Sequence, residues 1–299
     1  MRRAADVFSL LLVCCLPAVA QDFDDIKVER IAEKLSFAEG PVWLRDGGFL
    51  LFCDVPANRI MKFVGGEGTS VYRENSSGTQ GLAFDSQGRL FACEAHTRRV
   101  TRTDKKGKVE VIVERFEGKR LNAPNDLVVR HDNHLYFTDP AFGNQMDSRE
   151  LGFFGVYHVS PKGELEVIAK PKGRPNGIAL SPNGKTLYVA NSDEKRIYAY
   201  DLDNKGTASN ERAFISGIEG VPDGVKTDEK GNLYIAAKSV LIYTPEGKLI
   251  RDVPIAEKPS NLAFGDADLQ SLFVTARTSL FRLRLPVKGW SVDRASDSR

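Results

Sequence analysis

One phrase recurs six times along the chain, and this recurrence limits the folds that the chain can adopt. The phrase is a polar residue, a short alternating strand, a turn rich in Asp, Asn and Gly, and a second, more apolar strand. Repeats of about 40–50 residues that each supply about four strands are typical of a β-propeller. The six copies begin 37 to 51 residues apart, at Glu39, Gln80, Asn125, Asn176, Asp223 and Ser260.

We therefore predict an all-β fold, a six-bladed β-propeller with a central divalent-metal site. A pair of β-sandwiches is the alternative, but it does not explain six equal phrases. The segment 27–32 precedes the first phrase and is itself strand-like. We expect it to lie beside residues 280–285 as the outer strand of the last blade, which would close the ring and cover an open sheet edge.

The N-terminus has the pattern of a signal peptide. Arg2 and Arg3 precede the mostly apolar segment 7–19, and Ala18 and Ala20 form a small-residue cleavage site before Gln21. An uncleaved anchor or a lipid-modified cysteine is the alternative. We expect residues 1–20 to be removed, residues 21–299 to form a single propeller domain, and the mature protein to be secreted or periplasmic.

The charge balance excludes several classes of partner. Lys and Arg number 42 against 40 Asp and Glu, for a net charge of +2, and no basic block is present. This balance disfavours nucleic acid as a partner, and no other segment could cross a membrane. We expect a monomer or dimer. Only Cys53 and Cys93 lie beyond the signal peptide, and we expect both to be buried as small apolar side chains.

The first residues of the six phrases predict a metal site. Equivalent positions of innermost strands converge on the axis of a propeller, and all six occupants carry a side-chain oxygen. Two carboxylates and two carboxamides at one point suit a hard divalent cation, Ca²⁺ first, with Mg²⁺, Mn²⁺ or Zn²⁺ possible. Four protein ligands leave an open coordination position, as catalysis requires. The predicted metal ligands are Glu39, Asn125, Asn176 and Asp223. Polar residues that merely form turns are the alternative.

The end of the second strand in each repeat should lie near the same mouth, because that strand returns toward it. Those positions hold Asp54, Glu94, Asp139, Asn191, Lys238 and Arg277, and His96 and Phe142 follow shortly after. From this set come the predicted substrate-binding residues Glu94, His96, Asp139, Phe142 and Asn191.

Several phrases, in this order, resemble the gluconolactonase/regucalcin-like (SMP-type) lactonase family of six-bladed propellers. They are Glu39-Gly-Pro-Val-Trp43, Leu121-Asn-Ala-Pro-Asn-Asp-Leu127, Pro175-Asn-Gly177 and Pro222-Asp-Gly224. The resemblance implies one divalent cation, often Ca²⁺, on the same four residues that the repeats select. It also marks a departure: Ala123 stands where regucalcin-type members have a sugar-binding arginine, and Arg120 and Asn122 are the candidate substitutes.

The resemblance further implies a metal-dependent hydrolase that opens lactones, with Asp223 and Asn125 as catalytic residues and a small lactone or ester as substrate. Water would be activated either by the cation or by Asp223. A phosphotriesterase or arylesterase using the same site is one alternative. A non-catalytic secreted propeller with a structural cation is the other, and a site closed by Gln80 and Ser260 would favour it.

Overall fold

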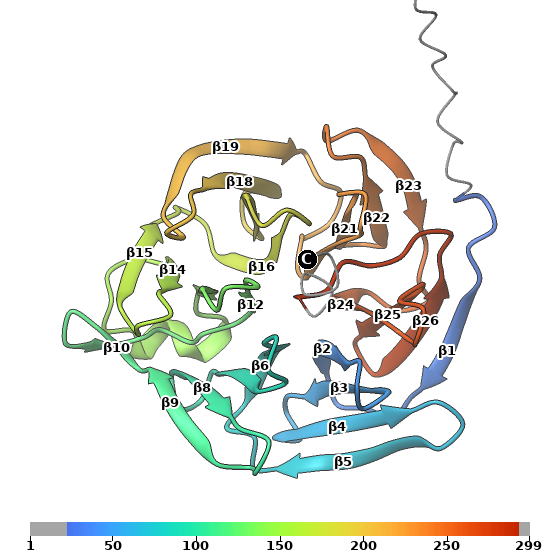
Figure 1. Cartoon of the computed structure of the whole chain (residues 1–299), viewed down its shortest axis with the longest axis horizontal. Helices are drawn as coiled ribbons and strands as arrows, with labels where there is room; N and C mark the ends of the chain where they lie inside the picture. The colour runs from blue at the N-terminus through green and yellow to red at the C-terminus, as the bar shows by residue number, and fades with distance from the viewer. Residues whose placement is uncertain (1–22, 293–299) are drawn as a thin grey trace, which may run out of the picture.

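The computed structural model describes residues 23–292, which form six four-stranded antiparallel sheets arranged as blades around a central channel (Figure 1). The prediction of a six-bladed β-propeller is confirmed. The predicted signal peptide, residues 1–20, lies outside the described residues. Within them, no helix is long and apolar enough to cross a membrane.

Each blade takes its strands from consecutive segments, innermost first, except that the last blade ends on the first strand of the chain. Blade 1 contains β2 (Ala38–Leu44), β3 (Phe49–Asp54), β4 (Arg59–Val64) and β5 (Gly68–Glu74). Blade 2 contains β6 (Thr79–Phe84), β7 (Leu90–Glu94), β8 (Arg99–Thr103) and β9 (Val109–Val113). Blade 3 contains β12 (Leu127–Val129), β13 (Leu135–Asp139), β14 (Gly155–Val159) and β15 (Leu165–Ala169). Blade 4 contains β16 (Pro175–Leu180), β17 (Thr186–Asn191), β18 (Arg196–Leu202) and β19 (Ala208–Ser216). Blade 5 contains β20 (Val225–Thr227), β21 (Leu233–Ala236), β22 (Val240–Tyr243) and β23 (Leu249–Val253). Blade 6 contains β24 (Pro259–Gly265), β25 (Ser271–Ala276), β26 (Ser279–Arg284) and β1 (Val28–Ala32).

The ring closes where β1 pairs antiparallel with β26. Val28 stands opposite Leu283 and Arg30 opposite Phe281, and Arg282 donates to Glu29 over 2.7 Å. The N-terminal strand is thus the outer strand of the last blade, as the repeat pattern predicted. Its pairing satisfies the backbone groups of β26, which would otherwise form an open edge.

The second strands of the blades are almost completely buried. Every residue of β7, β13, β21 and β25 is buried, because these strands pack against neighbouring blades on both faces. Outer strands such as β9 and β5 are largely exposed. Cys53 and Cys93 are free and buried in these second strands, as expected.

The innermost strands approach one another closely because glycine follows the first residue of the phrase in four repeats. A Cβ on Gly40 would lie 1.9 Å from the carbonyl oxygen of Gln80, and one on Gly177 would lie 2.1 Å from that of Asp223. No side chain fits at these distances. The glycines therefore bring backbone against backbone around the channel.

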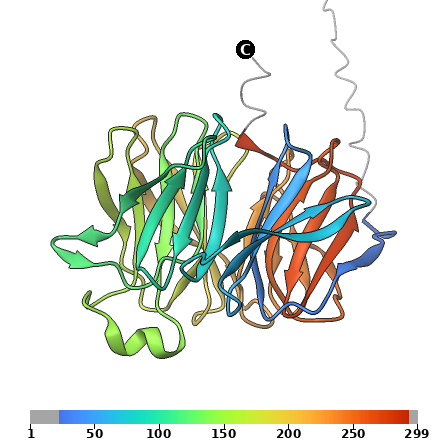
Figure 2. The same ribbon diagram turned by 90° about the horizontal axis from the view of Figure 1, so that it is seen from below.

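Two small elements lie outside the blades. The strands β10 (Arg115–Phe116) and β11 (Lys119–Arg120) form a hairpin, and the 3₁₀ helix η1 (Gly143–Ser148) follows the end of β13. Figure 2 shows η1 projecting beyond the strand ends on one face of the disc. Because β13 ends beside the start of the blade 3 inner strand, this is the face on which the predicted metal ligands lie.

Candidate metal centre

The four predicted ligands stand at the start of inner strands in blades 1, 3, 4 and 5. Glu39 and Asn176 are the second residues of β2 and β16, whereas Asn125 and Asp223 lie two residues before β12 and β20. Glu39 is 8% exposed and Asn176 is 5% exposed, while Asn125 and Asp223 are partly exposed. The structure places all four at one mouth of the channel.

Electrostatic interactions connect Glu39 with Asp223, and Asp223 with Asn176. Burial, and after it the charge of Asp223, raises the pKa of Glu39 well above its ordinary value. A hydrogen bond of 3.1 Å from the Gly40 amide to Glu39 opposes this rise. Burial raises the pKa of Asp223 to about 7, while the positive charge of Lys258 opposes this rise. Two carboxylates that both resist ionisation need a counter-charge if both are to be charged at neutral pH.

The amide of Asn176 provides a test of whether a cation fits. Its nitrogen donates to the hydroxyl of Ser192 over 3.1 Å, which fixes the orientation of the amide, yet its buried Oδ1 accepts no hydrogen bond. A buried acceptor without a donor costs about 1–3 kcal/mol, and a cation would remove that cost. With Glu39 and Asp223, Asn176 therefore supplies an all-oxygen donor set that fits a hard dication.

No group of three or more His, Cys, Asp and Glu side chains with metal-binding geometry occurs within residues 23–292. The predicted set holds only two residues of those types, because asparagines supply its other oxygens. The candidate centre thus rests on the mixed set of two carboxylates and two carboxamides.

Ser260, the first residue of the sixth repeat, connects blade 6 with blade 1. Its hydroxyl donates to the carbonyl oxygen of Ala38 over 2.6 Å and lies 3.0 Å from the Thr275 hydroxyl. In the same way, Thr138 donates to the carbonyl oxygen of Asn176 over 2.7 Å. These contacts hold adjacent inner strands in register and fix where the ligands stand.

The carboxylates at the ends of β3 and β13 support the loops that carry the ligands. Asp54 accepts from the amides of Ser36 and Phe37, just before Glu39. Asp139 accepts in the same pattern from the amides of Asn122 and Ala123, over 2.8 Å each. Burial nevertheless raises the pKa of Asp139 to about 7.

Glu94 and Asn191 are similarly engaged within their own blades. Glu94 accepts from Thr97, Arg99 and Thr101, and Asn191 exchanges hydrogen bonds with Glu194. The structure thus shows a supporting role for the residues that end these strands. Contact of Asp139, Glu94 and Asn191 with substrate stays a prediction.

Two predicted substrate residues, His96 and Asn122, meet in one cavity. This cavity has a volume of about 280 Å³ and is lined by Ala95, His96, Arg98, Asn122 and the η1 residues Asn144, Gln145 and Ser148. Asn122 is fixed by donating to the carbonyl oxygens of Asp139 and Phe153, and its Oδ1 has no partner. The cavity is polar, and Asn122 in its wall precedes the predicted ligand Asn125 by three residues.

Phe142 lies apart from that cavity, at the start of η1. The guanidinium of Arg174 stacks over its ring at 4.7 Å from the ring centroid, and Arg174 pairs with Asp193 of blade 4. Phe142 thereby joins the loops of two neighbouring blades at the mouth.

Sequence reasoning missed three residues near the ligands. Lys258 acts on Asp223 by its charge, and Asp126 and Asn261 lie beside Glu39 in the channel. Asp126 and Asn261 each follow the first residue of a repeat, where four other repeats have glycine. That break in the glycine pattern was the signal that could have identified them.

Comparison with known proteins places the whole propeller in one family. The model of the SMP-30/gluconolactonase/LRE-like region matches residues 37–278. A gluconolactonase of Zymomonas mobilis is 34% identical, over 88% of this chain and 82% of its own length. The solved structure of a gluconolactonase from Xanthomonas campestris is 33% identical with a TM-score of 0.81, over 88% of this chain and 90% of that one. Diisopropyl-fluorophosphatase of Loligo vulgaris is 27% identical, over 82% and 87% of the two chains.

Proposed function

The chain belongs to the SMP-30/gluconolactonase/LRE-like family and is a hydrolase, and we propose that it opens lactones with one divalent cation, Ca²⁺ first, held by Glu39, Asn125, Asn176 and Asp223. One observation carries the proposal. Two carboxylates and a buried, unpartnered amide oxygen face one space at the channel mouth, where they are costly unless a cation binds them.

When bound, the cation supplies Lewis acidity at the lactone carbonyl and the attacking water. The residues of the chain prepare that centre. Ser192 orients the Asn176 amide, and the Gly40 amide orients the Glu39 carboxylate. Asp223 has the exposure and the position to accept a proton from water at a carboxylate oxygen. Asn125, also partly exposed, orients the substrate.

The polar cavity beneath η1 supports a substrate that carries hydroxyl groups. Asn122 and the exposed imidazole of His96 both line this cavity. We propose that these two side chains bind the part of the lactone remote from its carbonyl. Regucalcin-type members have a sugar-binding arginine at the position of Ala123. Asn122 then takes over the role of that arginine, because Asn122 belongs to the same loop.

Organophosphates are the second candidate substrates, because the chain is similar to diisopropyl-fluorophosphatase along most of both lengths. The two reactions share the need for a polarised oxygen and an attacking water. The same residues therefore serve either, and the choice depends on the walls of the mouth.

A substrate panel tests the proposal. Residues 21–299, loaded with Ca²⁺, should hydrolyse aldonolactones faster than aryl esters or phosphotriesters, measured as kcat/KM by proton release. Asn122→Ala should raise KM for hydroxylated lactones more than for an unsubstituted lactone of the same ring size. Turnover of phosphotriesters alone would support the second candidate, and turnover of no substrate would support a binding protein with a structural cation.

We also propose that residues 1–20 direct export, so that the cation is taken up outside the cytoplasm. Sizing the mature protein from the periplasm and the medium by mass spectrometry tests both the cleavage site before Gln21 and the destination.

A further inference from the structure

The position after the first residue of each repeat forms a second layer of the channel, just beneath the candidate metal centre. Gly40, Gly81, Gly177 and Gly224 occupy four of its six places. A Cβ on Gly224 would lie 2.2 Å from Oδ1 of Asn261, and one on Gly81 would lie 2.8 Å from Oδ1 of Asp126. The glycines thus make room for the two side chains in the remaining places.

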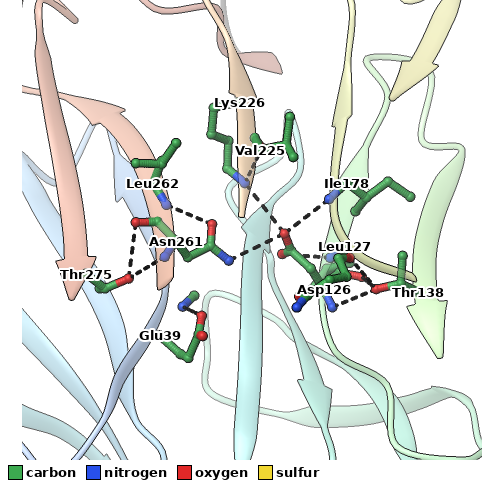
Figure 3. A network of polar contacts seen from close by, with 12 residues as sticks. Glu39, Asp126, Leu127, Thr138, Ile178, Val225, Lys226, Asn261, Leu262 and Thr275 are labelled. Carbon is green, nitrogen blue, oxygen red and sulfur yellow. Dashed lines mark hydrogen bonds and ion pairs between the residues drawn. The ribbon is translucent and has the colours of Figure 1, made fainter. Parts of the chain in front are cut away.

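Those two side chains, Asp126 and Asn261, reach toward each other across the channel from blades 3 and 6, which are opposite in the ring. The Asn261 amide nitrogen lies 3.5 Å from Oδ2 of Asp126, although the residues are 135 positions apart in sequence (Figure 3). Their exposed fractions are 1% and 3%. They close the channel beneath the ligands with a polar layer.

Asp126 connects the blades that supply three of the four ligands. It directly follows Asn125 in blade 3, its Oδ2 accepts from the amide of Ile178 in blade 4 over 3.3 Å, and it lies 3.8 Å from Nζ of Lys226 in blade 5 (Figure 3). Asn261 in turn lies within hydrogen-bonding reach of the Glu39 carboxylate in blade 1. One carboxylate therefore contacts every blade of the candidate centre directly or through one side chain.

The charges of this layer add to those of the centre. The Asp126 carboxylate joins those of Glu39 and Asp223, and Lys226 places one positive charge 3.8 Å from Asp126. Lys258 and Arg277 act on Asp223 from outside this layer, and their charges oppose the rise in its pKa.

We propose that Asp126 is a positioning residue whose charge strengthens cation binding from beneath the ligands, and that Lys226 is a built-in counter-charge that weakens this binding. This inference rests on the proposed cation site. It assigns opposite effects to two residues that touch each other, which a purely structural ion pair does not do.

The test measures cation affinity, not activity. Chelated residues 21–299 and the variants Asp126→Asn and Lys226→Met are titrated with Ca²⁺ by calorimetry. We expect Asp126→Asn to weaken binding about ten-fold, as outer-shell changes commonly do. We expect Lys226→Met to strengthen it by about three-fold or more, and the affinity of the double variant to lie between those of the two single variants.

A matched control is Asp85→Asn. Asp85 is also fully buried and pairs with an arginine, Arg89, at 2.6 Å, but it lies in the turn after β6, on the opposite face. This change should lower thermal stability and leave Ca²⁺ affinity unaltered. If Asp126→Asn fails to fold, Lys226→Met still carries the test, because tighter binding is not a consequence of damage.

Three outcomes decide the matter. Opposite shifts in the two single variants support the inference. Shifts in the same direction, or none, with wild-type protein that binds Ca²⁺, overturn the inference and leave the proposed function standing. Wild-type protein that binds no dication overturns both.

Discussion

Without the cation, the protein should become less stable as pH rises, which is the reverse of ordinary acid denaturation. Burial raises the pKa of Asp223 from 3.8 to about 7 and the pKa of Glu39 well above 4.5. Between these ordinary and raised values the folded state binds more protons than the unfolded state. The stabilisation is therefore complete below about pH 4 and is lost as pH rises through 7.

The magnitude follows from the size of the rise. A pKa raised from 3.8 to about 7 corresponds to an upper bound of about 4 kcal/mol for Asp223 alone. Glu39 adds to this loss with the same sign. Bound Ca²⁺ cancels it, because the cation favours the ionised forms of both carboxylates. Asp139 also has a raised pKa, but its effect is the same with and without the cation.

The assay is urea unfolding of residues 21–299 at pH 5, 6, 7 and 8, with chelator and with saturating Ca²⁺. The difference between the two curves isolates the centre from Asp139 and from other titrating groups. We expect that difference to grow by several kcal/mol from pH 5 to pH 8, and to grow less in Asp223→Asn. A difference that is constant with pH would refute the reasoning.

Three further predictions concern the framework. Gly177→Ala places a Cβ 2.1 Å from the carbonyl oxygen of Asp223. We expect the free energy of unfolding in urea to fall by about 3 kcal/mol or more, and Ca²⁺ binding to weaken. The control Gly66→Ala has open space around it and should lower that free energy by only about 1 kcal/mol. Deleting residues 21–32 removes β1 (Val28–Ala32) and opens the edge of β26; light scattering should detect self-association, and a monomeric product would contradict the expected role of this strand. Burial lowers the pKa of His134 and of His158, and Nδ1 of His134 lies 2.6 Å from Nε2 of His158. Ca²⁺-loaded protein should therefore lose stability as pH falls from 7 to 5. An equal loss of stability in His158→Gln would show that other groups are responsible.

The repeats made the fold predictable, because equivalent phrases have equivalent positions in a ring. Once six blades were assigned, Glu39 and Asp223 had to face the same mouth, although they are far apart in sequence. The closing strand was predictable for the same reason: the segment of β1 is strand-like and precedes the first repeat, and blade 6 needed an outer strand.

The contacts between repeats were not predictable from one repeat at a time. Asp126 and Asn261 occupy the same register position in opposite blades, and only the diameter of the channel shows that they meet. Asp139 looked like a residue of the pocket rim because it ends its strand at the mouth. The structure shows that both its oxygens bind the Asn122–Ala123 loop, a contact that depends on the path of that loop.

The most direct test of the account is a titration of Ca²⁺ into chelated residues 21–299 while lactone hydrolysis is followed. Activity should return in proportion to bound cation and reach its maximum at one ion per chain, and Glu39→Gln should recover none of it at the same concentrations. Full hydrolysis by the chelated protein, or by Glu39→Gln without bound cation, would contradict a metal-dependent centre at the channel mouth.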